Sequence, residues 1–504
     1  MGKLPLISLR NFLGDRVVER GRGNLVVRPA TVDELCRAVE MLADAGCTMR
    51  AAAADNRPAA VNAVIALDGL DRVVEINEAD RFVTVEAGCT WRALHRALSS
   101  HRLRTPFFGP FGDGSETIGA SASTNAHFFG SGIHGTMNDT VLGLDVVLVD
   151  GSLVETGAAA AEGRTPFFRH FGPDLTGLFL GDSGAFGIKA RVTLPVIPLP
   201  GAEDFVSFAF ERFEDIGAAH AVLAREGLAA EHWGLDPDRN ELLAARGHRA
   251  LDGVTFSRNG TIPLRGDRAR ATVPPRLIDG HRIVQRGGWS FHAVTEGVDA
   301  REAEGKVAQI RKLLLPTAMR EIPPAIPAAL RARPFDMDDL RATRHVARHV
   351  AAGLFPLSRA TEMAAVTDEY FIRHQETMAR DDIGLSIVTG ATRSAFSIEA
   401  TVSWPPANAG VQDAAETLVR DLSLLWGAFG AAEHGAGRDQ GYANALSSAA
   451  LALTRSVKSA LDPRNLMNPG ALGFGATPRK PAALKFAEFP QHLETGAGTP
   501  GWKS

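Results

Sequence analysis

The sequence has few cysteines, few tyrosines and no long apolar run. Its 504 residues include three cysteines and two tyrosines, and aromatic residues make up only 7%. The cysteines, Cys36, Cys47 and Cys89, are too few and too scattered for a disulfide framework or a zinc site, and they suit a reducing compartment. No run reaches the ~20 apolar residues of a membrane span, and the N-terminus lacks the apolar stretch of a signal peptide. We therefore expect a cytoplasmic protein without a membrane span.

The charge balance excludes a further class of partner. Lys and Arg number 54 against 58 Asp and Glu, which gives a net charge of −4. Because there is also no block of basic residues, neither nucleic acid nor an anionic membrane surface is an expected partner. A chain of this length, with 45% hydrophobic residues, can build two or three domains.

What the sequence does contain is concentrated between Ser115 and Gly151. A run of small residues from Thr117 to Ser123 would let the backbone approach a large ligand and present amide N–H groups to it. An equal interpretation is that these small residues let structural elements pack tightly. The aliphatic run Val141–Val149 ends at Asp150-Gly151, a strong hairpin signal, and residues 152–156 would form the partner strand. We predict a ligand loop anchored to a buried sheet.

The rest of the N-terminal part alternates strands and helices. A strand over 24–28 precedes Thr31 and Glu34, a capping-box pair that predicts a helix. A second glycine-rich turn at 181–187 leads into a strand over 188–194. The prolines that follow predict a domain boundary near residue 200.

Beyond that boundary the pattern predicts a second α+β domain with an antiparallel sheet. The expected strands cover 205–210, 229–235, 289–295 and a pair within 384–404, and the expected helices cover 213–226, 300–314 and 411–426. The proline-rich segment 321–334 is expected to cross a surface or line a cleft.

Several passages, in the expected order over about 450 residues, together resemble one family. These passages are residues 26–46, 73–98, 115–151, 178–188 (LFLGDSGAFGI), 433–438 (EHGAGR) and 461–470 (LDPRNLMNPG). They resemble the vanillyl-alcohol oxidase and para-cresol methylhydroxylase flavoproteins, especially the branch with D-lactate and glycolate dehydrogenases.

The resemblance implies an α+β fold. A two-part FAD-binding domain of mixed α/β structure would be completed by the C-terminal segment, and a cap domain would contribute an antiparallel sheet with flanking helices. The implied bounds are 1–200 for the FAD-binding domain of the para-cresol methylhydroxylase type, 201–430 for the substrate-binding cap, 431–475 for the C-terminal return and 476–504 for a tail.

The resemblance also implies which residues contact FAD. Gly119, Ser123, Thr124 and Asn125 would follow the flavin and pyrophosphate, Gly184 and Ile188 would lie near the adenine end, and Asn468 would approach from the return. The full set is Arg50, Ala51, Ala52, Ala53, Ala54, Asp55, Thr117, Ile118, Gly119, Ser121, Ser123, Thr124, Asn125, His127, Gly135, Thr136, Gly184, Gly187, Ile188 and Asn468. For His127 and His134, contact with the flavin ring and ordinary packing are equal alternatives.

The first phosphate loop departs from the family pattern. The family has Arg followed by several glycines and a Ser or His, whereas this chain has four alanines and Asp55 after Arg50. Alanine disfavours positive φ, and Asp55 would bring a negative charge near phosphates. FAD binding would thus be weakened or achieved with a rearranged loop. Because a His that often carries the flavin is missing, we expect noncovalent FAD.

The second departure concerns the reaction. Hydroxy-acid dehydrogenases of this branch hold a divalent metal with two cap histidines and the Glu of EHG, but here Gly390 and Ser397 stand near the histidine positions. We therefore expect no metal site. By resemblance, His434 is the candidate general base beside Glu433, Arg393 is a candidate carboxylate clamp, and Tyr442 is a candidate acid/base or orienting group. Tethering, a solvated strand edge and packing are the respective structural alternatives.

The expected function is that of an FAD-dependent oxidoreductase, an oxidase or dehydrogenase that oxidises a small or medium organic substrate by hydride transfer to flavin N5. A tailoring reaction, such as alcohol oxidation or oxidative decarboxylation, fits the missing histidines. The alternatives are a D-2-hydroxy-acid dehydrogenase with a rebuilt site and a flavin-less scaffold of the same fold. A homodimer is one allowed assembly, and the sequence leaves the electron acceptor open.

Overall fold

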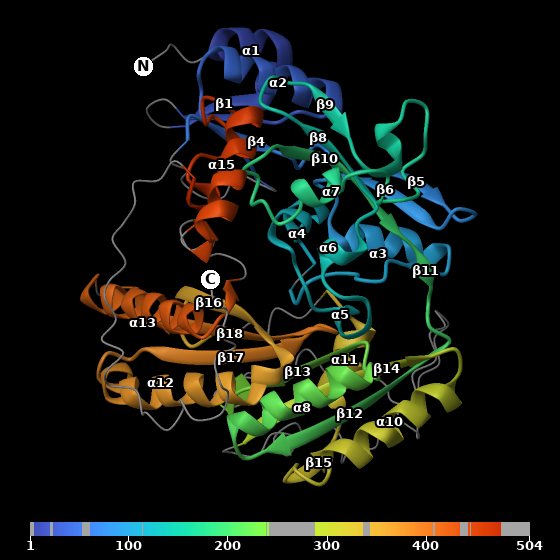
Figure 1. Cartoon of the computed structure of the whole chain (residues 1–504), viewed down its shortest axis with the longest axis vertical. Helices are drawn as coiled ribbons and strands as arrows, with labels where there is room; N and C mark the ends of the chain where they lie inside the picture. The colour runs from blue at the N-terminus through green and yellow to red at the C-terminus, as the bar shows by residue number, and fades with distance from the viewer. Residues whose placement is uncertain are drawn as a thin grey trace.

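The computed structural model describes residues 5–20, 24–52, 61–112, 114–237, 239–240, 288–335, 343–406, 409–433, 442–443 and 445–474. Figure 1 shows two parts, with the N-terminal sheets above and a large sheet with its helices below. The C-terminal helix returns to the upper part, beside β1 and β4. Within the described residues, no helix combines the length and the apolar character needed to cross a membrane.

The first unit of the upper part is a four-stranded sheet in the order β1-β2-β4-β3. Its elements are α1 (Leu6–Leu13), β1 (Val17–Arg20), β2 (Asn24–Val27), α2 (Val32–Asp44), β3 (Met49–Ala52) and β4 (Ala63–Ala66). The predicted cap is confirmed at Thr31, whose side chain accepts a hydrogen bond from the N–H of Glu34. The Glu34 carboxylate does not complete a capping box but accepts from Ala30 N–H and pairs with Arg16.

The second unit is a five-stranded sheet in the order β5-β6-β10-β8-β9. Its strands are β5 (Val73–Asn77), β6 (Phe82–Glu86), β8 (Gly143–Val147), β9 (Leu153–Glu155) and β10 (Ile188–Pro195). The predicted hairpin at Asp150-Gly151 is confirmed, because β8 and β9 pair antiparallel across it. A short pair of strands, β7 (Leu103–Arg104) and β11 (Ile197–Pro198), lies beside this unit.

Helices lie along the chain between the strands of the second sheet. They are α3 (Trp91–Ser100), α4 (Ile118–Thr124), α5 (Ser131–His134), α6 (Met137–Thr140) and α7 (Leu175–Leu178). The predicted ligand loop is therefore wrong in its local structure, since the small-residue run forms the helix α4. Its N-cap, Thr117, accepts a hydrogen bond from Ala120 N–H, and its C-cap, Asn125, has a left-handed backbone with φ 55°.

The lower part is an antiparallel sheet of eight strands, in the order β15-β12-β14-β13-β17-β18-β16-β19. The strands are β12 (Ala202–Phe210), β13 (Glu231–Leu235), β14 (Trp289–Gly297), β15 (Arg320–Ile322), β16 (Ala347–Pro356), β17 (Gly384–Ala391), β18 (Ala395–Trp404) and β19 (Ala432–Glu433). The predicted antiparallel sheet is thus confirmed, and so is the predicted strand pair within 384–404.

The two faces of this sheet pack differently, as the period of two along a strand requires. Phe396, Ile398 and Ala400 of β18 share one core with the helices α8 (Phe213–Glu226), α10 (Ala300–Leu314), α12 (Ala360–Arg380) and α13 (Ala409–Ala428). Trp233 and Leu235 of β13 point the other way and share a core with the upper part. The sheet therefore has a helix-covered face and a face directed toward the N-terminal part.

The proline-rich segment 321–334 was expected to cross a surface or line a cleft, and the structure differs. It contains a buried helix, α11 (Ala325–Ala332), whose Ile326, Ala328 and Leu330 join the core shared with the upper part. Prolines are tolerated there because they stand before the helix and in its first turn, where no intrahelical N–H bond is lost.

The chain closes by returning to the first sheet through α15 (Ser448–Leu461) and the segment after it. Met467 bridges to Met49 of β3, and the Arg464 side chain donates to the carbonyl of Ala43, 2.5 Å away. An α+β fold with a two-part N-terminal region completed by the C-terminal segment, as predicted, is confirmed.

Candidate functional site

Four segments that the sequence assigns to cofactor binding meet at Ser183. Its N–H donates to the carbonyl of Ser123 at the end of α4, 3.0 Å away. Its own carbonyl accepts from the side-chain amide of Asn468 at 2.6 Å. The N–H of Asn468 donates in turn to the carbonyl of Met49, directly before Arg50. The fold thus brings together α4, the second glycine-rich turn, the C-terminal return and the start of the first phosphate loop.

A buried carboxylate shapes the second glycine-rich turn. Asp182 accepts from the N–H groups of Gly184 and Phe186, at 2.9 and 3.3 Å, and forms an ion pair with Lys189. Ser183 and Gly184 both adopt positive φ, 51° and 75°. A Cβ on Gly184 would have only the Asn468 amide nitrogen near it, at 3.7 Å, so the space above this glycine is open. The turn is therefore held from inside the protein by the contacts of Asp182 and is accessible at Gly184.

Lys458 of α15 fastens the C-terminal return to the same turn. Its ammonium donates to the carbonyls of Ala185 and Met467, at 2.7 and 2.9 Å, and pairs with Asp462 at 2.7 Å. Because this side chain is only 7% exposed, burial lowers its pKa, but Asp462 favours the charged form. The return is therefore attached both by its backbone and by a buried charge.

The predicted free amide groups of the small-residue run are not free at residues 118–121. The N–H groups of Ile118 and Gly119 donate to the carbonyls of Cys89 and Ala87, and those of Ala120 and Ser121 donate to Thr117. A Cβ on Gly119 would lie 2.7 Å from that of Ala87, so glycine serves close packing there. The packing interpretation holds for this buried half of α4.

The opposite half of α4 remains accessible. Ala120 and Thr124 are exposed and Ser123 is half-buried, which is the spacing of one helical face. Asn125 is half-buried, and its side-chain carbonyl accepts from Asn138 N–H at 3.2 Å. A ligand that touches α4 would therefore contact this face and the end of the helix.

The other predicted cofactor residues have structural tasks of their own. Thr136 caps α6 through Asp139, and Gly135 has a φ of 87° directly before it. Gly187 packs against Val146, since a Cβ would approach that side chain to 2.5 Å, and Ile188 is buried at the start of β10. Arg50, Ala51 and Ala52 lie in β3, whereas Ala53, Ala54 and Asp55 lie outside the described residues.

His127 and His134 are both half-buried. Burial lowers the pKa of His127 to about 4. Burial also lowers the pKa of His134, and Arg104 and Arg393 lower it further through their positive charge, against the effect of Glu296. Both imidazoles are therefore neutral at pH 7.

Of the four residues predicted to be catalytic, the described residues include Arg393, Glu433 and Tyr442. Arg393 lies at the turn between β17 and β18, where its side chain is exposed and its N–H donates to Ser131 O at 3.2 Å. The backbone of Glu433 pairs with Gly353 of β16, while His434 lies outside the described residues. Tyr442 is 38% exposed. In the described part of the chain, no three His, Cys, Asp or Glu side chains are grouped as metal ligands would be.

Side chains of β13, β17, β18 and β16 form rows on the sheet face that is directed toward the N-terminal part. Cross-strand partners share a face, and the register forms two adjacent rows. The first row consists of Trp233, Gly390, Ser397 and Leu354. The second row, beside the first, consists of Leu235, Val388, Glu399 and Ala352. Gly390 and Ser397, noted in the sequence at the family's histidine positions, are therefore direct neighbours. Glu399 is not among the residues predicted from the sequence, although its two-residue spacing from Ser397 places it on the same face of the sheet.

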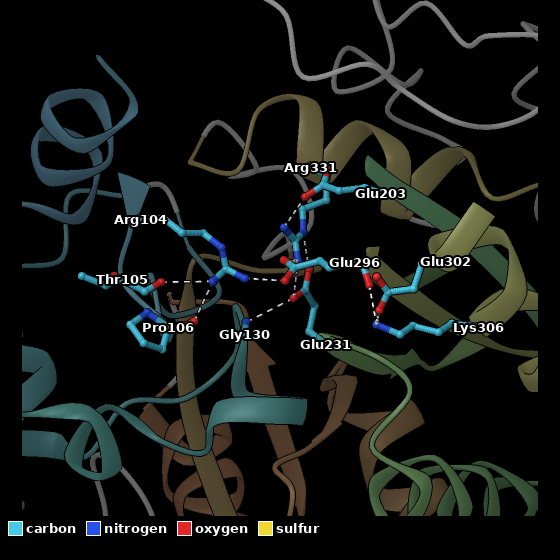
Figure 2. A network of polar contacts seen from close by, with 10 residues as sticks. All are labelled: Arg104, Thr105, Pro106, Gly130, Glu203, Glu231, Glu296, Glu302, Lys306 and Arg331. Atoms are coloured by element: carbon cyan, nitrogen blue, oxygen red, sulfur yellow. Dashed lines mark hydrogen bonds and ion pairs between the residues drawn. The ribbon is translucent and has the colours of Figure 1, made fainter. Parts of the chain in front are cut away.

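A buried ionic network joins the two parts of the molecule (Figure 2). Arg331 of α11 contacts three carboxylates: Glu231 at 2.5 and 2.8 Å, Glu203 at 2.5 Å and Glu296 at 2.9 Å. Arg104 of β7 pairs with Glu296 from the other side and donates to the carbonyl of Pro106 at 2.8 Å. The network is not predicted from the sequence, because its members come from separate strands and one helix.

The network contains two guanidinium groups and three carboxylates. Burial raises the pKa of Glu203 to about 7, although Arg331 opposes the shift. Burial also acts on Glu296, but Arg104 and Arg331 outweigh it and lower its pKa to about 2. Glu231 accepts from Gly130 N–H at 3.1 Å, and burial raises its pKa. The raised pKa values of Glu203 and Glu231 therefore let the network hold a proton near neutral pH.

FAD fits the surface around Ser183. The space above Gly184 is open, the accessible face of α4 carries the small side chains of Ala120, Ser123 and Thr124, and the Asn468 amide lies beside Ser183. An extended dinucleotide needs such close approach to a backbone.

Comparison with known proteins agrees with this arrangement. Residues 24–157 match the family described as FAD binding domain, and residues 291–472 match FAD linked oxidases, C-terminal domain. The chain is 30% identical over 164 residues to the mitochondrial D-lactate dehydrogenase (cytochrome) 1 of Saccharomyces cerevisiae. It is 34% identical over 132 residues to a probable mitochondrial D-lactate dehydrogenase of Danio rerio.

These two alignments cover 32% and 26% of this chain, and the chain spans only 26% and 25% of the length of the relatives. The likeness in three dimensions is wider. A structure of p-cresol methylhydroxylase with bound substrate aligns over 92% of this chain and 95% of its own, with a TM-score of 0.73 and 15% identity. At that identity the likeness shows the fold alone.

Proposed function

Because this chain belongs to the FAD-linked oxidoreductases that join an FAD binding domain to a FAD linked oxidase C-terminal domain, we propose that it is an FAD-dependent oxidoreductase acting on a small or medium organic substrate. The observation that carries the proposal is the meeting of α4, the second glycine-rich turn, the return and β3 at Ser183 and Asn468. These residues would hold FAD, with residues 1–200 and 431–475 as its domain.

When bound, FAD supplies the acceptor for a hydride from a substrate carbon. The protein has to orient the substrate, exclude water and accept a proton. Residues 201–430 would form the cap that covers the substrate, and the sheet face that carries Gly390, Ser397 and Glu399 supports this role because it is directed toward the N-terminal part. By resemblance, His434 and Glu433 would accept and relay the proton, while Arg393 and Tyr442 would orient the substrate.

The reaction class that we favour is a tailoring oxidation, such as an alcohol oxidation or an oxidative decarboxylation. The Gly390 and Ser397 pair supports it, because neither side chain can replace a histidine ligand of a divalent metal. The second candidate is a D-2-hydroxy-acid dehydrogenase with a rebuilt site, which the names of the sequence relatives favour.

The test is anaerobic reduction of the purified, FAD-loaded protein by a panel of alcohols, phenols, larger acids and D-2-hydroxy acids. Bleaching of the flavin by an alcohol or a larger acid without added metal is the expected result. Bleaching by D-lactate that depends on added divalent metal would establish the second candidate instead. A colourless protein whose spectrum does not change with added FAD would overturn the proposal and leave a scaffold of this fold.

Further parts of the proposal concern the cofactor and the protein's setting. We propose noncovalent FAD, which acid precipitation should release into the supernatant. Replacing Asp55 with Gly should tighten FAD binding if its charge opposes the phosphates. A cytoplasmic location and a homodimer are also proposed, and fractionation and sedimentation would test them.

A further inference from the structure

Glu399 stands alone in an apolar patch of the sheet face that is directed toward the N-terminal part. Its direct cross-strand neighbours are Val388 and Ala352, and the next row carries Ser397 between Gly390 and Leu354. Leu235 continues the Glu399 row on β13. In these two rows Glu399 is the single charged side chain.

This patch is partly open, although it lies inside the large sheet. Glu399, Val388, Ala352 and Leu354 are each half-buried, whereas the residues between them on the opposite face, such as Ile398 and Ala400, are fully buried beneath helices. Gly390 carries no side chain beside Glu399's row, and an added Cβ there would lie close to the Ser397 hydroxyl, at 3.0 Å. These half-buried side chains therefore face the part of the molecule that would hold the flavin.

Glu399 differs from the other carboxylates between the two parts of the molecule. Glu203, Glu231 and Glu296 are paired with Arg331, but no hydrogen bond or ion pair joins the Glu399 carboxylate to any residue that the structure describes. The arginines on these strands and their connecting turn are Arg393, at the turn between β17 and β18, and Arg348 of β16, two rows away opposite Ser403. Neither pairs with Glu399.

A ligand that covers the patch removes water from this carboxylate. Burying an unpaired carboxylate is strongly unfavourable, and an opposite charge is the most effective compensation. A carboxylate on the ligand would add repulsion at short range. An apolar body suits the half-buried Val388 and Leu354, while a positive group suits Glu399.

We propose that Glu399 is a substrate-contacting specificity residue that selects organic molecules with an apolar body and a positively charged amine, and disfavours carboxylates. The inference rests on the proposed function, since it places the substrate between this face and the flavin. It names the substrate class of that site and separates it from 2-hydroxy acids. Of the two tailoring reactions proposed above, it favours the alcohol oxidation over the oxidative decarboxylation of an acid.

The test uses three ligands of one shape, benzylamine, benzyl alcohol and benzoate, with the full-length FAD-loaded protein. Binding is followed by the change in flavin absorbance and by titration calorimetry at pH 7. The wild type should bind benzylamine at least ~10-fold more tightly than benzyl alcohol, and benzoate most weakly. Glu399→Gln, which keeps the shape and removes the charge, should reduce the preference for the amine to within ~2-fold and strengthen benzoate binding.

The matched control is Glu376→Gln, which removes the same charge from an exposed position on α12, on the helix-covered side. It should retain the wild-type preference. If Glu399→Gln and the control give the same order of affinities, or if the wild type shows no preference for the amine, the inference is wrong. Calorimetry needs no flavin, so it also measures ligand binding if the protein binds no FAD. In that case a preference for amines that depends on Glu399 would overturn only the proposed oxidoreductase function.

Discussion

The side-chain amide of Asn468 donates a hydrogen bond to the backbone carbonyl of Ser183, 2.6 Å away, across 285 residues of sequence. Asn468 itself has a left-handed backbone, with φ 41°. The bond holds the C-terminal return against the second glycine-rich turn, and the Asn468 N–H reaches Met49 of β3 at 2.7 Å. One residue thus aligns three of the segments assigned to FAD.

Replacing Asn468 should weaken FAD binding. Asn468→Gly keeps the positive φ without strain and removes only the side-chain bond, so a loss of about 1 kcal/mol, or roughly 5-fold in the dissociation constant, is expected. Asn468→Ala removes the bond and also strains the backbone, so it should in addition lower the melting temperature further than Asn468→Gly does. Flavin fluorescence titration and thermal unfolding measure the two effects. An unchanged FAD affinity in both variants would show that this contact does not shape the cofactor site.

Gly119→Ala should destabilise the protein. The added Cβ would lie 2.7 Å from the Cβ of Ala87 and 2.9 Å from its carbonyl oxygen, so α4 must shift, at a cost of about 1–3 kcal/mol. The control is Gly305→Ala on the exposed side of α10, where a Cβ meets nothing within 4 Å. Because alanine favours helix over glycine, that variant should gain about 0.5–1 kcal/mol. Equal effects in chemical denaturation would contradict the close packing of α4.

Arg331→Met should be strongly destabilising. It leaves Glu231, Glu203 and Glu296 without their shared partner in a site where the Arg331 side chain is only 5% exposed, and breaking a buried pair in this way costs about 3–5 kcal/mol. Arg37→Met removes a surface partner of Glu40, with side chains 55% and 42% exposed, and should cost under about 0.5 kcal/mol. Urea unfolding of the two variants gives the comparison, and similar values would argue against the network as a joint between the two parts.

Glu203→Gln should change how stability depends on pH. Burial raises the pKa of Glu203 from its ordinary value of 4.5 to about 7, so the folded protein binds a proton that the unfolded chain has released between these values. The contribution of this group to the free energy of unfolding is therefore greatest below pH 4.5. It falls by on the order of 3 kcal/mol at most as the pH rises to about 7, and it then stays level. Melting temperatures at pH 5 and pH 8 should differ less in the variant than in the wild type. An equal slope in both proteins would mean that another group holds the proton.

Glu296, in the same network, should make stability depend on pH in the opposite direction to Glu203. Arg104 and Arg331 lower the pKa of Glu296 to about 2 despite its burial, so its contribution is present above pH 4.5 and is lost as pH falls toward 2. Glu296→Gln should therefore weaken the loss of stability between pH 4.5 and pH 3, which thermal unfolding in that range would measure. If the variant and the wild type lose stability in parallel there, Glu296 does not carry the acid transition.

Local sequence patterns were sufficient for most elements of the fold. Alternation and helical spacing predicted the strand pair within 384–404 and the helix over 411–426, and the structure has β17, β18 and α13 there. They failed for residues 118–124, because Gly and Ser have low helix propensity and the helix depends on packing against Ala87. They failed again at 325–332, where prolines concealed a buried helix.

The sequence by itself determined the α+β class, the hairpin at Asp150-Gly151 and the segments assigned to FAD, because these depend on residues that are near one another along the chain. Only the tertiary structure decided that Ser123, Ser183 and Asn468 touch, that Arg331 collects three carboxylates, and that Glu399 stands unpaired among Leu235, Val388 and Ala352. Contacts of this kind join residues up to hundreds of positions apart. They depend on the register of distant strands and on the burial of charge. No local pattern of side chains encodes either.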